Sequence, residues 1–89
     1  MEALKRMIGE LVVLDTDSPI VYIGRLKEIT ELTFVLTETD LHDCRDGHAN
    51  KERYLMEAHE DGVQANRHEI VVMRSVVISA SRLADVVAE

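Results

Sequence analysis

The sequence predicts a mainly β protein: a small, strongly bent barrel of five strands, accompanied by short helices. Valine, isoleucine and leucine gather in five short apolar runs, and β-branched residues favour strands. Gly24 lies inside the second run, where a glycine indicates a bend or bulge. Five short strands with one sharp bend cannot form a wide sandwich, so a small barrel is the economical arrangement. The length of 89 residues fits a single domain, which we expect to span residues 1–89.

The expected elements follow one another without a linker or an internal repeat. Residues 2–8 (EALKRMI) are good helix formers, and Gly9 can end a short helix there. A turn at residues 16–19 (TDSP) separates the first strand from the second. The strands are expected in five segments: ELVVLD from Glu10, IVYIGRLKEI over 20–29, TFVLTET over 33–39, EIVVM over 69–73 and VVISA over 76–80.

A helix near residues 50–61 is expected to interrupt the strands between the third and the fourth. Asn50 can cap its N-terminus, and Gly62 fits a C-terminal stop. An apolar stripe would pack on the barrel or on an adjacent subunit: Tyr54, Leu55 and Ala58.

Several strand segments are apolar at consecutive positions, as in residues 11–14, 71–73 and 76–78. A strand with one solvated face alternates between apolar and polar side chains. These strands therefore have both faces covered, one by the core and the other by a helix or a second subunit.

The glycine and apolar positions together resemble the Sm/LSm family. Its first motif matches at Gly9, Val12, Gly24, Leu26, Ile29, Phe34 and Leu36, and its second resembles Met73-Arg74-Ser75 followed by Val77 and Ile78. The resemblance implies an Sm-like (SH3-like) barrel capped by the N-terminal helix, with residues 50–61 as an insertion. In that family the fourth strand of one subunit pairs with the fifth of the next to close a ring. It therefore implies a homo-oligomer, with these interface residues: Val71, Val72, Met73, Val76, Val77 and Ile78.

The same resemblance implies RNA as a partner, bound at Thr33, Arg74 and Ser75. The family carries Asp and Asn in the loop before the third strand, where this chain has Thr30 and Thr33, and Ser75 replaces the family's glycine. The net charge of −7 does not attract a phosphate backbone from a distance. Two functions stay open: a non-catalytic ring that binds RNA, and a protein–protein scaffold that has lost RNA readout.

Residues 40–48 are rich in aspartate and histidine, which raises a third interpretation, a metal-binding protein. Carboxylates and imidazoles bind zinc and other divalent ions, and the candidate ligands are His42, Asp43 and His48. The stretch lacks a spacing signature such as His-x-x-x-His, and aspartate is common in turns. We therefore expect a solvated connection without a metal or another cofactor.

Cys44 beside His42 or His48 is the candidate nucleophile–base pair. Such catalysis also needs an orienting group and a pocket, whereas a small barrel fills its interior with side chains. We expect no catalytic residue and no enzyme. As the one cysteine, Cys44 also excludes an intrachain disulfide. The chain start lacks a signal-peptide core, and no apolar run reaches the roughly 18 residues of a membrane span. A cytoplasmic protein without a membrane partner is expected.

Overall fold

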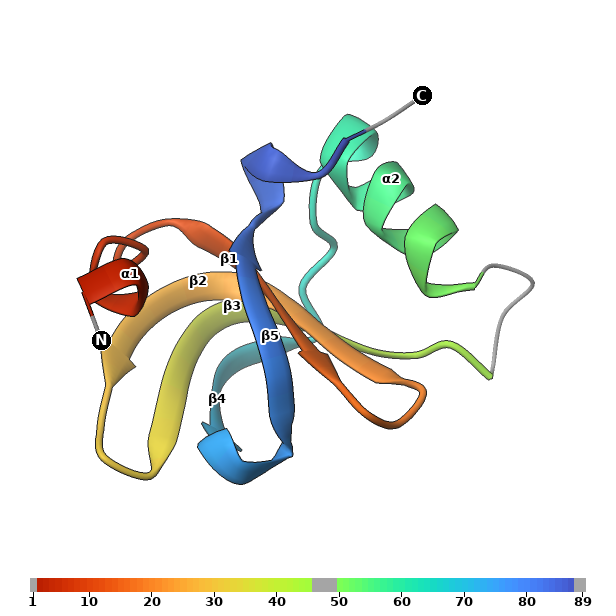
Figure 1. Cartoon of the computed structure of the whole chain (residues 1–89). Coiled ribbons are helices and arrows are strands. Elements are labelled where there is room, and N and C mark those ends of the chain that lie inside the picture. The colour runs from red at the N-terminus through yellow and green to blue at the C-terminus, as the bar shows by residue number, and fades with distance from the viewer. Residues whose placement is uncertain (1, 46–49, 88–89) are drawn as a thin grey trace.

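A computed structural model describes residues 2–45 and 50–87 (Figure 1). Over these residues the chain forms one antiparallel sheet of five strands in the order β4-β3-β2-β1-β5, with two α-helices and two short 3₁₀ turns. The strands are β1 (Leu11–Thr16), β2 (Ile20–Ile29), β3 (Thr33–Asp43), β4 (Arg67–Met73) and β5 (Val77–Arg82). The helices are α1 (Glu2–Lys5) and α2 (Lys51–Asp61), and the 3₁₀ turns are η1 (Arg74–Val76) and η2 (Leu83–Asp85). The mainly β fold class is confirmed.

The sheet bends strongly along β2, as Figure 1 shows. The pairing of β2 with β3 shifts register between Ile23 and Arg25, on either side of Gly24. A Cβ atom added to Gly24 would lie 2.3 Å from Thr39 Oγ1, far inside a normal contact distance. Only glycine therefore lets β2 and β3 approach at the bend, as the sequence predicted.

Two apolar clusters cover the two faces of the central strands. The inner core consists of Val12, Leu14, Leu26, Phe34, Leu36 and Val72, with Leu4 and Met7 of the N-terminal segment packed against it. The outer core consists of Val13, Val21, Ile23, Tyr54, Ala58 and Leu83. Val12 and Leu14 of β1 belong to the inner core, and Val13 between them belongs to the outer core. Both faces of β1 are therefore covered, which explains why its residues are apolar at consecutive positions. The helix expected to cover the second face is α2.

The helix boundaries follow their capping residues. Asn50 accepts a hydrogen bond from the Arg53 N–H through its side chain, which begins α2 at Lys51. The Gly62 N–H donates to the Ala58 carbonyl, and the φ angle of Gly62 is 90°. This left-handed conformation, which glycine adopts easily, ends α2. At the N-terminus the helix covers only Glu2–Lys5, shorter than the predicted residues 2–8. Residues 6–9 turn instead, and the Gly9 N–H donates to the Leu26 carbonyl at 2.7 Å, which ties this end to β2.

Strand β3 is longer than predicted and runs to Asp43 rather than residue 39. Residues 40–43 pair with Ile20–Ile23 of β2, so the first four of the nine residues in the aspartate- and histidine-rich stretch are regular strand. Among the described residues, neither helix has the length and apolar character needed to cross a lipid bilayer.

Candidate nucleic-acid interface

Two turns meet at one end of the sheet and bring together the three predicted RNA-binding residues. Thr33, at the start of β3, pairs with Met73, at the end of β4, so the β2–β3 turn and η1 are neighbours. The Arg74 backbone N–H donates to the Leu32 carbonyl at 2.9 Å. Arg74 Nη1 donates to the carbonyls of Thr30 at 2.9 Å and Glu31 at 3.3 Å. We call residues 30–33 and 74–76 the paired turns.

The β2–β3 turn is held by hydroxyl groups. Thr30 Oγ1 accepts the N–H groups of Thr33 at 2.9 Å and Leu32 at 3.3 Å. The same oxygen lies 2.5 Å from Thr33 Oγ1. Threonine hydroxyls often bond nearby backbone in this way, and here they set the shape of the turn.

Arg74 also contacts the inner core. Its guanidinium carbon lies 5.6 Å from the centre of the Phe34 ring, a cation–π arrangement. A cavity of about 290 Å³ lies beside this contact and is lined by Leu4, Phe34, Arg74, Val77, Ile78, Ser79 and Ala80. The Arg74 side chain thus fastens η1 to both the neighbouring turn and the core.

The predicted oligomer interface falls on β4, η1 and β5, and β4 and β5 are the two edge strands of the sheet over the described residues. Val71 and Ile78 are 55% and 63% exposed, and Met73 and Val76 are also exposed. Val72 is buried in the inner core, and Val77 packs against that core. Because side chains alternate along a strand, only four of the six predicted side chains are available on this surface.

The predicted metal candidates do not converge among the described residues. The His42 ring stacks on Tyr54 with 3.9 Å between ring centroids and 7° between planes. Asp43 accepts hydrogen bonds from the Arg45 side chain and backbone. These bonds lower the pKa of the Asp43 carboxyl to about 2. His48 lies outside the described residues, and within them no three histidine, cysteine, aspartate or glutamate side chains gather as metal ligands.

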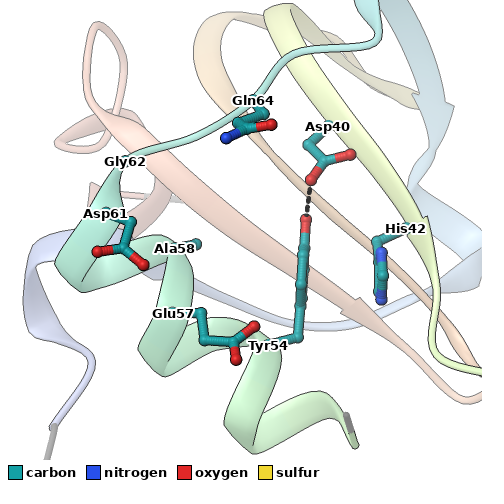
Figure 2. A pocket seen from close by; sticks show the side chains of 8 residues that line it. All are labelled: Asp40, His42, Tyr54, Glu57, Ala58, Asp61, Gly62 and Gln64. Carbon is teal, nitrogen blue, oxygen red and sulfur yellow. Dashed lines mark hydrogen bonds between the residues drawn. The ribbon is translucent and has the colours of Figure 1, made fainter. Parts of the chain in front are cut away.

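The Tyr54 side chain joins α2 to β3, as Figure 2 shows. Its hydroxyl donates to Asp40 Oδ2 at 2.5 Å, and Asn66 Nδ2 donates to Asp40 Oδ1 at 3.0 Å. Burial, and then the Asp40 carboxylate, raise the pKa of the Tyr54 phenol above its ordinary value. A cavity of about 310 Å³ opens beside Tyr54, with Glu57 and Asp61 among its other lining residues. His42 Nε2 is buried and has no hydrogen-bond partner among the described residues.

Cys44 sits just after β3, and its backbone N–H donates to the Pro19 carbonyl. Burial raises the pKa of its thiol. Nucleophilic cysteines need the opposite shift, because the thiolate is the reactive form. The surroundings of Cys44 are therefore those of a packed residue.

Some of these contacts were not foreseen from the sequence. The stack of His42 on Tyr54 and the bridge from Asn66 to Asp40 join residues far apart in the chain, without a spacing pattern to reveal them. The contact of Arg74 with Phe34 could have been predicted from the sequence. Both residues occupy matched motif positions, Phe34 in β3 and Arg74 just after β4, so their proximity follows once β3 and β4 are paired.

No protein-family model matches the sequence, and no curated protein matches it either. A solved structure that is similar to this chain is an Sm protein from Pyrococcus abyssii in complex with a uridine heptamer. It is 18% identical in sequence, with a TM-score of 0.62, and the match covers 91% of this chain and 93% of that chain. At this identity the likeness establishes the fold. The chain has an Sm-like fold, as the motif resemblance implied.

Proposed function

We propose that this chain is a non-catalytic, cytoplasmic Sm-like module that assembles with copies of itself and binds single-stranded RNA at the paired turns. The observation that carries the proposal is the junction of Thr33 with Arg74 and Ser75 in a fold of this class. Arg74 Nη1 holds the Thr30 carbonyl at 2.9 Å, which fixes the two turns as one surface. Preorganised surfaces bind with a smaller loss of conformational entropy.

Assembly is supported by the two edge strands. Unpaired edges template association unless charges or prolines block them. The charged residues of β4 lie at its start, Arg67 to Glu69, whereas Val71 and Met73 of β4 and Ile78 of β5 are exposed apolar side chains. In the proposed arrangement, β4 of one copy pairs with β5 of the next. Such a head-to-tail contact closes into a ring when the rotation between copies allows it.

RNA binding is supported by the geometry of the paired turns and by the fold neighbour, whose structure holds a uridine heptamer. One copy offers little attraction to phosphate, because its net charge is −7. A ring places one Arg74 per copy around the same axis. Several weak contacts to one RNA strand then act together and raise the apparent affinity.

The second candidate function is a protein–protein scaffold without RNA binding. The contacts of Arg74 support the scaffold function, because its Nη1 group is already hydrogen-bonded within the protein, to the carbonyls of Thr30 and Glu31. The acidic total charge favours it as well.

Two measurements test the proposal. Native mass spectrometry should give one defined homo-oligomer, and a strict monomer at micromolar concentration would contradict the assembly. Fluorescence anisotropy with a labelled uridine heptamer at about 20 mM salt should show binding that weakens as salt rises. A defined oligomer without RNA binding would leave the scaffold as the function.

A further inference from the structure

The hydrogen-bonding groups of the paired turns lead to an inference about which RNA they accept, and it rests on the proposed function. We propose that this surface binds single-stranded RNA without preference for one base. Reading a base requires a fixed pattern of donors and acceptors aimed at its edge. The side chains of residues 30–33 and 74–76, all within the described part of the chain, offer no such pattern.

Thr30 is used by the turn itself. Its oxygen accepts two backbone N–H groups, from Leu32 and Thr33, and lies 2.5 Å from Thr33 Oγ1. A hydroxyl has one proton and two acceptor lone pairs. The two N–H groups occupy the lone pairs, so the Thr30 proton points to Thr33.

Thr33 and Ser75 keep hydroxyl capacity, but a hydroxyl does not discriminate. Its O–H rotates, and it donates to an acceptor or accepts from a donor equally well. A hydroxyl therefore bonds the uracil O4 acceptor and the cytosine N4 donor equally well. A side-chain amide differs, because it holds an acceptor and a donor in fixed places, and neither turn contains asparagine or glutamine.

Arg74 contributes charge without base readout. Its Nη1 group donates to the carbonyls of Thr30 and Glu31, and its guanidinium lies over Phe34. These contacts direct Nη1 to the turn carbonyls and the guanidinium to Phe34, so Nη1 is engaged within the protein instead of with a base. The positive charge of Arg74 attracts phosphate, and that attraction is the same for every sequence.

Glu31 and Leu32 complete the surface. Leu32 is exposed and offers an apolar contact to the face of any base. The Glu31 side chain is exposed, and its negative charge repels phosphate whatever base follows. The Glu31→Ala variant, which removes the charge without adding an amide, should therefore bind all sequences more tightly by a similar factor.

Anisotropy titrations with labelled heptamers of uridine, adenosine and cytidine test the proposal at low salt. The three dissociation constants should agree within about threefold, whereas one good base-edge contact changes them by tenfold or more. A tenfold preference for one base would overturn this inference and leave RNA binding intact. Absence of binding by all three would overturn both this inference and RNA binding.

Variants extend the test to the residues themselves. Arg74→Ala should weaken all three complexes by similar factors. Arg53→Ala removes the same charge from the exposed face of α2 and should leave them unchanged. Thr33→Asn should create a preference, because it supplies the fixed donor and acceptor that the turn lacks. With its fold verified by circular dichroism, a Thr33→Asn protein that still binds the three heptamers equally would place the bases away from this turn and refute the proposal.

Discussion

The contact between Gly24 and Thr39 shows how little room the bend in the sheet leaves for a side chain. Thr39 is fully buried, and its Cβ and Cα also lie within 3.0 Å of a Cβ built on Gly24. Thr39 Oγ1 has no hydrogen-bond partner among the described residues. A buried hydroxyl without a partner is unfavourable by about 1–3 kcal/mol, so Thr39 carries a local energetic cost at the bend.

Gly24→Ala should lower the free energy of unfolding by about 1–3 kcal/mol, because the added methyl group meets Thr39. Urea unfolding followed by circular dichroism measures the change. Adding Thr39→Ala removes the nearest atom, and the double variant should recover part of the loss. Losses that simply add would show that the two residues are not in contact.

The phenol of Tyr54 should stay protonated in alkaline solution while the protein is folded. Its pKa is raised from the usual value of 10.0. The folded state therefore favours the protonated phenol, and this contribution to stability is complete below pH 10 and declines as the pH rises further. The chain has two tyrosines, so absorbance at the phenolate wavelength in a Tyr22→Phe variant reports Tyr54 alone. A phenolate signal at its ordinary pH, with circular dichroism unchanged, would contradict the buried contact with Asp40.

At the scale of elements, α2 forms an outer layer on the sheet. Tyr54 and Ala58 point into the outer core beside Val13, Val21 and Ile23. Lys51 Nζ, at the start of α2, also bonds the end of β1. It donates to Asp15 Oδ1 at 2.6 Å and to the Thr16 carbonyl at 2.8 Å. The helix is a structural layer of the fold, because without it three apolar side chains of β1 and β2 would face water.

Ala58→Asp should destabilise the protein by more than about 2 kcal/mol, since a carboxylate at this buried position loses water and shares its cavity with the acidic side chains of Asp40, Glu57 and Asp61. Ala65→Asp is the matched control. It makes the same change at an exposed site just after α2 and should cost under about 0.5 kcal/mol. Thermal unfolding of both variants checks the difference, and equal melting temperatures would show that α2 does not pack on the sheet.

At the scale of the whole molecule, the two edge strands give each copy two different surfaces. Val71 belongs to β4 and Ile78 to β5, and each is exposed on its own edge. A lysine on an edge strand is a common natural block to edge pairing. Each edge can therefore be blocked while the other stays intact.

Val71→Lys and Ile78→Lys should each leave the protein monomeric, because every β4-to-β5 contact then contains one blocked edge, while Val87→Lys, on an exposed residue outside both edges, should leave the oligomer unchanged. An equimolar mixture of the two edge variants should form a one-to-one heterodimer, because the intact β5 of the first fits the intact β4 of the second. Native mass spectrometry separates the species by mass. Homodimers of either variant alone would instead point to a symmetric contact between like edges.

Much of this architecture could be predicted from local signals. The apolar runs predicted the strands, Gly24 predicted the bend, and Asn50 and Gly62 predicted the ends of α2, because caps and bends depend on one or two residues. The length of β3 could not be predicted in this way. Asp40 and Asp43 favour turns by type, and they are strand because residues 40–43 pair with Ile20–Ile23.

The candidate site also has features that could be predicted from the sequence and features that could not. The position of Thr33, Arg74 and Ser75 beside one another follows from strand pairing and was expected. The engagement of the Arg74 guanidinium by the turn carbonyls depends on backbone geometry that residue types do not specify. Val72 was expected on the interface and is in the inner core, because the facing of each strand residue depends on a register that consecutive apolar residues leave undetermined.

The outer core also has a consequence for the order of events during synthesis. Its members come from residues 13–23, from α2 and from Leu83, near the end of the described chain. Strand β1 likewise lacks one neighbour until β5 has been made. A growing chain therefore exposes the apolar outer face of β1 and β2 until first α2 and then Leu83 have been made. Shielding of this face by a chaperone would matter most in that interval.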